Sequence, residues 1–314
     1  MAHFKVEDLS IGEVQKTRYQ ASLWGCGFEQ RCTYLLSLVS DDQIGHQRAF
    51  GFQVPVKSQG RLAAEEYFAS RSVLIREFGG ADDASIFQTL NELPIDLHDS
   101  IHLLVDYSSM TRTWYASILR WACLANTTKV TIDFCYSTGR YPADIPPTQI
   151  TDVLCIPGCE GSGSSQKSSI AVFGLGFEPW PPLCVIDKLE PNDVYAVIAD
   201  PGASEGDVAR ALLINDEFIR QNAPNNIVRL PLRSVASTYY GLLELIDPFL
   251  GNAKTSLIFL GPKPHVLASI LVAMSASDVA CLHVSGLRND EVNVEATGEM
   301  VVTRVTVYPR TVMP

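Results

Sequence analysis

The feature that most constrains the fold of this chain is a short motif that occurs twice, each time after a short apolar run. The first copy, GCGFEQR, covers residues 25–31 and follows the run 19–24, and the second, GLGFEPW, covers 174–180 and follows the run 170–173. Short continuous apolar runs are typical of strands buried on both faces of a parallel sheet. A glycine pair at the end of such a strand lets the backbone approach a neighbour or a ligand closely. The repetition therefore predicts two related α/β halves.

Two further pairs of landmarks occur in the same order in both halves. Asp106, which begins DYSSMTR, corresponds to Gly261, which begins GPKPH, and Ser137 of STGR corresponds to Ser285 of SGLR. The offsets are 155 and 148 residues, against 149 for the glycine motif. Three landmarks at similar offsets indicate an internal duplication.

The segments between the landmarks alternate between strand and helix patterns. Helices are predicted over 30–39, 61–79, 84–93, 108–126, 206–222, 234–245 and 265–275. Strands are predicted over 46–55, 100–105, 129–136, 193–202, 226–232, 256–260 and 279–284. The prolines at 179, 181 and 182 should disrupt a helix after the second glycine motif. This alternation predicts the α/β class, with two Rossmann-like halves of mostly parallel strands packed about a pseudo-two-fold axis.

The domain boundary is predicted at the Gly/Ser-rich stretch GCEGSGSSQKSS. It gives a first half at 1–157, a linker at 158–169 and a second half at 170–314, which ends in the strand-like extension EMVVTRVTVYP.

Composition limits the classes of partner. The formal net charge is −11, from 24 basic and 35 acidic residues, which argues against broad nucleic-acid binding. No apolar run approaches the roughly 20 residues that span a bilayer, and the polar N-terminus does not read as a signal peptide, so a cytoplasmic protein without membrane contact is expected. Most of the eight cysteines lie in apolar runs, as buried free thiols do, and no metal site or cofactor is predicted.

The candidate site residues all lie where predicted strands end, because ligands bind at the carboxyl ends of parallel strands. In the first half they are Gly25, Gly27, Glu29, Arg31, Asp106, Ser108, Ser109, Thr111, Arg112 and Arg140. In the second half they are Gly174, Gly176, Glu178, Lys263, His265 and Arg288. Backbone N–H groups at a helix start, hydroxyls and arginine suit an anion such as phosphate. The first half is expected to hold the working site, since the second lacks the hydroxyls and the first arginine.

Structural roles remain open for several of these residues. The glycines can simply form a tight turn, and Ser108 or Ser109 can serve only as the helix N-cap. Glu29 and Arg31 can be solvated, and His265 can be structural. Glu178 repeats Glu29, which fits a shared structural role as well as it fits catalysis.

The segment 106–112 resembles the strand-four motif of the CARF sensor domains, roughly Asp-x-Thr-Gly-Gly-Thr-Lys, and tandem copies in one chain are similar to the related SAVED domains. The match involves Asp106, Ser108, Thr111 and Arg112, while Ser109-Met110 stands where that family has two glycines. The resemblance implies a Rossmann-like fold and a cyclic oligonucleotide ligand in prokaryotic antiviral signalling.

The function expected from these patterns is a bacterial sensor or partner subunit that binds a nucleotide-type anion at a central cleft, with an effector protein or a second copy of the chain as a possible partner. The alternative is an enzyme that cleaves or transfers a nucleotide or phosphate ester there, with Glu29, Arg31 and Arg112 as candidates. A third hypothesis is a scaffold subunit whose cleft no longer binds a ligand.

Overall fold

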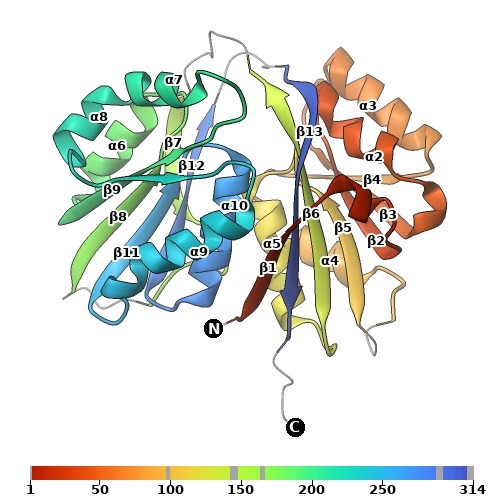
Figure 1. The fold of residues 1–314 in the computed structure, drawn as a ribbon. Helices are drawn as coiled ribbons and strands as arrows, with labels where there is room; N and C mark the ends of the chain where they lie inside the picture. The colour runs from red at the N-terminus through yellow and green to blue at the C-terminus, as the bar shows by residue number, and fades with distance from the viewer. Residues whose placement is uncertain (1, 97–99, 142–147, 163–166, 288–292, 310–314) are drawn as a thin grey trace. The chain divides into compact units, whose positions relative to one another are not determined.

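The computed structural model describes residues 2–96, 100–141, 148–162, 167–287 and 293–309 (Figure 1). The chain divides into two compact units. The N-terminal unit comprises Ala2–Pro142 together with Glu291–Pro314, and the C-terminal unit comprises Ala143–Asp290. Each unit is built around its own mostly parallel sheet, so the predicted α/β class with two Rossmann-like halves is confirmed.

The N-terminal sheet has seven strands in the order β1-β13-β6-β5-β2-β3-β4. They are β1 (Phe4–Leu9), β2 (Tyr19–Cys26), β3 (Ile44–Phe52), β4 (Leu74–Phe78), β5 (Ile101–Asp106), β6 (Val130–Arg140) and β13 (Glu295–Val307). Strands β2 to β6 pair in parallel in the order 3-2-1-4-5 of the first five Rossmann strands, and β13 runs antiparallel to both β6 and β1. The connecting helices are α1 (Ile11–Val14), η1 (Gln30–Thr33), α2 (Tyr34–Leu38), η2 (Asp41–Gln43), α3 (Gln59–Ser70), α4 (Ala84–Asn91) and α5 (Arg112–Leu124).

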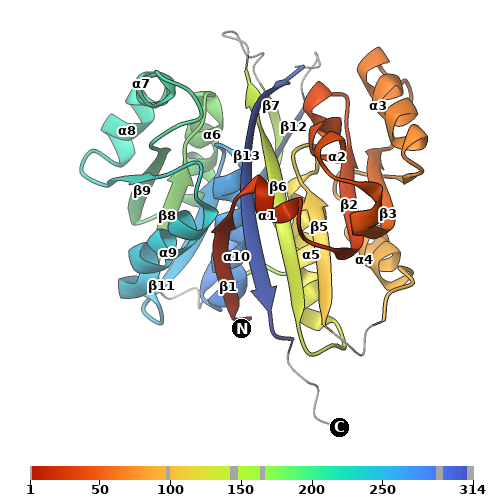
Figure 2. The same ribbon diagram turned by 45° about the vertical axis from the view of Figure 1, so that its right-hand side comes forward.

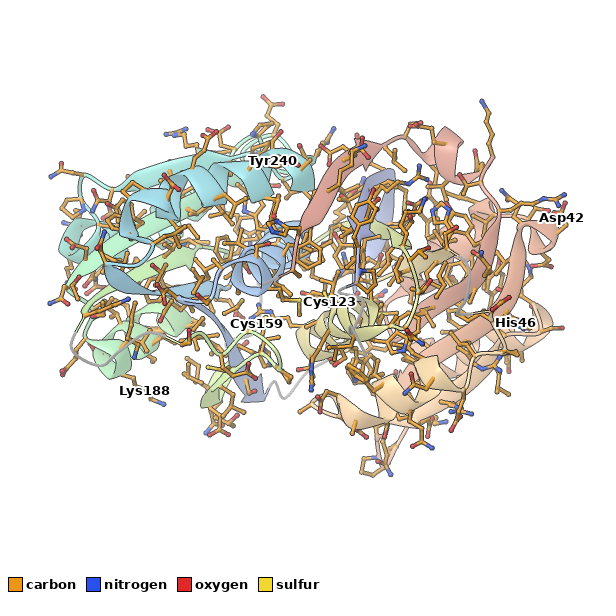
Figure 3. The ribbon with its side chains drawn as sticks, turned by 90° about the horizontal axis from the view of Figure 1, so that it is seen from below. Asp42, His46, Cys123, Cys159, Lys188 and Tyr240 are labelled. Carbon is orange, nitrogen blue, oxygen red and sulfur yellow. The ribbon has the colours of Figure 1, made fainter. Side chains whose placement is uncertain are left out.

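The C-terminal sheet repeats this order as β10-β9-β8-β11-β12-β7. Its strands are β7 (Gln149–Cys155), β8 (Ser168–Gly174), β9 (Asp193–Ala199), β10 (Ile227–Leu230), β11 (Ala253–Phe259) and β12 (Val279–Leu287). Its helices are α6 (Trp180–Leu189), α7 (Asp207–Ile214), α8 (Asp216–Asn222), α9 (Val235–Ile246), η3 (Asp247–Phe249) and α10 (Lys263–Ser275). Figure 3 shows Lys188 of α6 and Tyr240 of α9 on opposite sides of this sheet, so helices cover both faces.

The two halves of the chain each contribute one strand to the sheet of the other half. In the chain β7 follows β6, yet it pairs with β12, and β13 follows β12, yet it pairs with β6 (Figures 1 and 2). The C-terminal strand therefore completes the N-terminal sheet and does not extend the second half, and β7 belongs with the second half. The predicted boundaries at 157 and 170 are corrected accordingly. An apolar alternation indicates a strand, but it does not identify the strand's partner.

The segment predicted as a linker is bonded to the C-terminal sheet over its described part. The backbone of Cys281 donates to Cys159 at 2.9 Å and accepts from Ile156 at 2.9 Å, and the Ser162 amide donates to Ser277 at 2.6 Å. Residues 163–166 lie outside the described residues, and β8 begins at Ser168.

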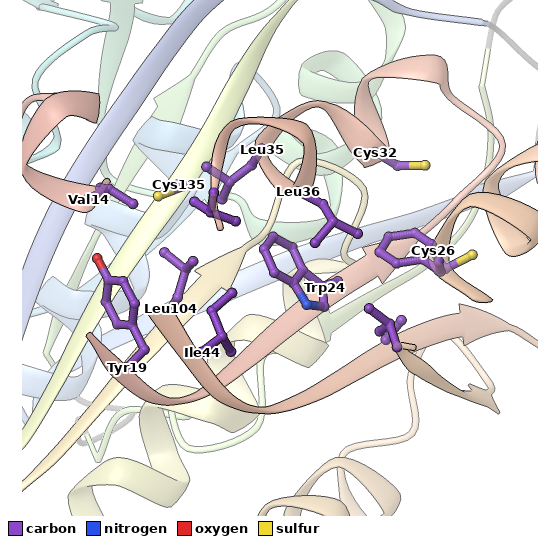
Figure 4. Packing of buried hydrophobic residues seen from close by; sticks show 14 of the residues in the cluster. Val14, Tyr19, Trp24, Cys26, Cys32, Leu35, Leu36, Ile44, Leu104 and Cys135 are labelled. Atoms are coloured by element: carbon purple, nitrogen blue, oxygen red, sulfur yellow. The ribbon is translucent and has the colours of Figure 1, made fainter. Parts of the chain in front are cut away.

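The core between the N-terminal sheet and helices α1 to α3 contains large side chains from several strands. Figure 4 shows Trp24 of β2 beside Leu36 of α2, with Leu104 and Ile44 nearby. Trp24 and Leu36 have no exposed surface. Full burial of one such side chain contributes about 1.5–3 kcal/mol to the free energy of folding. This layer therefore holds η1 and α2, which follow β2, against the sheet.

Three local predictions differ from the structure. The single helix predicted over 61–79 is α3 followed by β4, because the backbone reverses at Ser72, where φ is 57°. The helix α6 forms despite its prolines, because Pro181 and Pro182 lie in the first turn, where no intrahelical N–H is needed. Thr111, and not Ser108 or Ser109, caps α5 by accepting from the Trp114 amide at 3.2 Å. Across the described ranges, no helix combines the length and apolar character of a membrane span.

Candidate functional site

Two loops meet at the carboxyl edge of the N-terminal sheet, where β2 and β5 lie side by side. A Cβ atom placed on Gly25 would lie 2.9 Å from the Met110 nitrogen, and one placed on Gly27 would lie 3.0 Å from the Ser109 Cβ. Neither glycine has a positive φ. The glycine pair is therefore required by the close approach of the two loops, and not by a turn with a positive φ.

Asp106 and Ser108 lie fully buried at this edge and connect its strands. The Asp106 carboxylate accepts from the Ser108 amide at 2.9 Å, and the Ser108 hydroxyl accepts from the Ser137 amide of β6 at 2.8 Å. Thr111 donates to the Gly80 carbonyl at 2.8 Å. These three predicted site residues thus fix the shape of the loop that carries Ser109.

Arg31 is an almost fully buried cation at this edge, with 1% of its surface exposed. Its Nε donates to Glu29 at 2.7 Å, Nη1 donates to the Tyr136 hydroxyl at 2.9 Å and to the Ser137 carbonyl at 3.2 Å, and Nη2 donates to the Tyr141 hydroxyl at 3.3 Å. Burial opposes its charge, but Tyr136, Tyr141 and Glu29 outweigh that effect and raise the pKa of Arg31. Arg31 is a permanent cation held inside the unit, so the alternative that it is solvated is wrong.

Glu29 joins the two loops weakly. Its carboxylate is paired with Arg31 at 2.7 Å and lies 3.4 Å from the Ser109 hydroxyl, which is the donor. The negative charge of Glu29 is therefore offset locally.

Arg61 of α3 reaches the same edge and was missed by the sequence analysis. It donates to the Cys26 carbonyl at 2.8 Å and pairs with Glu65 at 2.9 Å and Glu77 at 3.1 Å. Gly51 of β3 makes room for its guanidinium, because a Cβ there would overlap Nη2. The glycine inside an otherwise regular strand pattern was the signal that could have indicated this close approach.

The remaining arginines of the prediction are differently placed. Arg112 is the first residue of α5 and is half-buried. Arg140 ends β6 and is exposed. Arg288 lies outside the described residues.

The corresponding edge of the C-terminal unit brings together Gly176 and Gly261, because a Cβ on Gly176 would lie 3.1 Å from the Gly261 Cα. Gly174 adjoins the Phe259 ring in the same way. Glu178 accepts from the Thr148 hydroxyl at 2.8 Å, directly before β7. The glycine motif thus has the same position in both units, at the end of β2 in the N-terminal sheet and of β8 in the C-terminal sheet.

His265 and Lys263 lie in the first turn of α10 in that unit. His265 is buried, its Nε2 lies 3.2 Å from the Pro231 carbonyl, and burial lowers the pKa of its imidazole to about 4. A neutral imidazole packed against a carbonyl has a structural role. Lys263 is the first residue of α10, as Arg112 is of α5.

No known family model matches this chain, and no curated protein sequence matches it. Within the described ranges, no three His, Cys, Asp or Glu side chains are grouped as a metal ion would require. The groups described at the N-terminal edge are backbone amides, the Ser109 hydroxyl, arginine and the Glu29 carboxylate that Arg31 pairs with.

Proposed function

We propose that this chain is a sensor or partner subunit whose N-terminal unit binds a nucleotide-type anion at the carboxyl edge of its sheet. The observation that carries the proposal is the contact between the Gly27 and Ser109 loops beside the first turn of α5. In open parallel sheets, ligands bind where neighbouring strands lead to opposite faces. Here that point lies between β2 and β5.

Electrostatics favour an anion at this point. Helix α5 has 13 residues, no acidic side chain in its first turn, and Arg112 as its first residue. The amide groups at a helix start and the helix dipole attract negative charge. The nearest carboxylate, Glu29, has its charge offset by Arg31.

The resemblance of residues 106–112 to the CARF and SAVED domains extends the proposal to a cyclic oligonucleotide in a prokaryotic antiviral system, read out by an effector protein. The acidic composition favours a small anionic ligand over a long nucleic acid, since the net charge is −11.

The test is calorimetric titration with ATP, cyclic di-AMP, cyclic tri-adenylate and cyclic tetra-adenylate. Arg112→Ala should weaken binding of the preferred probe roughly tenfold to a hundredfold, because a charged hydrogen bond contributes about 1.5–3 kcal/mol. Lys263→Ala is the matched control, since Lys263 begins the 13-residue helix α10 of the other unit. It should change the Kd less than threefold. Thermal melts of both variants exclude unfolding.

Two results would count against the proposal. If the parent protein binds none of the four probes, the proposed function fails. If Lys263→Ala weakens binding more than Arg112→Ala, the site is not at the N-terminal edge. Mass spectrometry of each probe after incubation tests turnover, and conversion to a cleaved product would favour the enzyme alternative.

A further inference from the structure

In both units a glycine near the end of the last parallel strand lies against the start of the exchanged strand, β13 or β7. A Cβ on Gly139 of β6 would overlap Val294, the residue directly before β13. A Cβ on Gly286 of β12 would overlap Thr148, the residue directly before β7. In each sheet the glycine pairs with the second residue of the exchanged strand. Gly139 and Gly286 thus each make room for the side chain directly before the strand that arrives from the other half of the chain.

The loop that carries the glycine motif bonds to that same point. In the N-terminal unit the Gln30 amide donates to the Asn293 Oδ1 at 3.3 Å. In the C-terminal unit the Thr148 hydroxyl donates to Glu178 at 2.8 Å. Both motif copies therefore hold the start of an exchanged strand, which gives the repeated sequence a structural reason.

The N-terminal copy adds a second connection through Arg31. Its guanidinium contacts Tyr141, where the chain leaves β6, and it would lie 2.9 Å from a Cβ on Gly139. The corresponding residue of the other copy is Trp180, which is 62% exposed. The N-terminal motif is therefore tied both to the chain that leaves β6 and to the chain that returns as β13.

We propose that the return of β13 positions the residue 25–31 loop for its ligand, with Asn293 and Arg31 as positioning residues, so that ligand binding and the docking of β13 stabilise each other. This inference takes its ligand from the proposed function. The connection between the ligand loop and β13 is given by the hydrogen bonds of Asn293 and Arg31 described above. Coupling of this kind is reciprocal. If docking of β13 raises the ligand affinity by some factor, ligand binding raises the equilibrium constant for docking of β13 by the same factor.

The test compares Asn293→Ala, which removes the acceptor of the Gln30 amide, with Asn293→Asp, which keeps a side-chain oxygen. Thr148→Val is the control in the other copy, because it removes the hydroxyl that bonds to Glu178 at nearly constant volume. Asn293 is exposed, so the variants should fold. Hydrogen exchange by mass spectrometry is measured without probe on peptides covering 28–36 and 174–182, and with cyclic tetra-adenylate on a peptide covering 300–307.

Asn293→Ala should raise exchange at 28–36 at least threefold and weaken binding of cyclic tetra-adenylate threefold to tenfold. Asn293→Asp should match the parent within twofold in exchange at 28–36, the readout that its added charge does not confound. Thr148→Val should raise exchange only at 174–182 and leave affinity unchanged. In the parent, cyclic tetra-adenylate should slow exchange at 300–307, and Asn293→Ala should lose this effect.

The proposal is overturned if Asn293→Ala leaves exchange at 28–36 unchanged, or if it raises exchange while the affinity stays at the parent value. If the parent binds no probe, the proposed function fails. The exchange arm, which needs no probe, then still decides whether Asn293 holds the loop, so the two failures are distinguishable.

Discussion

Replacing Arg304 with methionine tests whether β13 is an integral strand of the N-terminal unit. Arg304 lies on β13, and its Nε and Nη2 donate to the two carboxylate oxygens of Asp133 on β6 at 2.7 and 2.8 Å. Asp133 is fully buried, and it also accepts from the Tyr19 hydroxyl at 2.8 Å. The variant keeps Asp133 and removes its only arginine partner among the described contacts.

Removing one partner of a buried ion pair costs about 3–5 kcal/mol, because the other charge stays buried without its partner. The Tyr19 hydroxyl and the His102 imidazole, whose Nε2 lies 3.2 Å from Asp133, remain in place. The free energy of unfolding of Arg304→Met should therefore fall by about 3 kcal/mol at pH 7, the low end of that range. The double variant Asp133→Asn/Arg304→Met should recover more than half of this loss, because no charge is then left buried.

The loss should depend on pH in a definite direction. Burial raises the pKa of Asp133, but the hydrogen bonds from Arg304, His102 and Tyr19 outweigh burial and lower it overall. A lowered pKa stabilises the fold above the unfolded value of about 3.9, and this stability is lost as the pH falls through the folded value. Without Arg304 the pKa of Asp133 rises, so the carboxyl is neutralised at a higher pH. The difference between parent and variant should therefore shrink from pH 7 to pH 4.

Urea denaturation followed by tryptophan fluorescence is the appropriate assay. Three of the four tryptophans lie buried in the N-terminal unit, whereas Trp180 of the other unit is 62% exposed. The signal therefore reports mainly on the unit that contains β13. A loss below about 1 kcal/mol, or a difference that grows on acidification, would refute the reasoning.

Three further outcomes are expected. Gly139→Ala should lower the free energy of unfolding by about 1–3 kcal/mol in the urea assay, since the nearest atoms to the added methyl belong to the side chains of Val294 and Arg31. Gly286→Ala should lower it more, because the Gln149 carbonyl oxygen lies 2.9 Å from the added Cβ. Equal losses would contradict this reasoning. The imidazole of His265, with its pKa lowered to about 4 by burial, should stay neutral down to pH 5 in an NMR titration, and the C-terminal unit should lose stability between pH 6.5 and 4 because the unfolded chain takes up the proton first. A midpoint near 6.5 in the folded protein would show that the site is hydrated. Iodoacetamide at pH 7.5 should modify the exposed thiols first, as peptide mass spectrometry would show. These are Cys155 and Cys184.

Local sequence patterns were sufficient for the class of fold. Continuous apolar runs such as 101–105 can be buried on both faces only in a sheet covered by helices, and the alternation with helical segments made that sheet parallel. The repeated glycine motif located the carboxyl edges of both sheets correctly, because a glycine pair at a strand end reflects a close approach of backbone. These features depend on neighbours within a few residues, and the sequence displays them directly.

The roles of individual site residues depended on distant parts of the chain. Arg31 is buried because Tyr136 and Tyr141, more than 100 residues away, surround it. Ser108 bonds to the Ser137 amide of β6, 29 residues away, and Thr111 donates to the Gly80 carbonyl, 31 residues away. Hydrogen-bond partners at such separations leave no periodic trace in the sequence.

The sequence by itself indicated that the C-terminal segment 299–309 is extended, since side chains alternate between two faces along a strand, whereas the strand at 149–155 was not predicted. Only the tertiary structure decided where they pair: β13 joins β6, and β7 joins β12. The physical reason is that backbone hydrogen bonds to a sheet edge are nearly independent of side chains, so the choice of edge rests on a few long-range contacts. Here these are the Asp133–Arg304 pair and the two glycines that receive Val294 and Thr148.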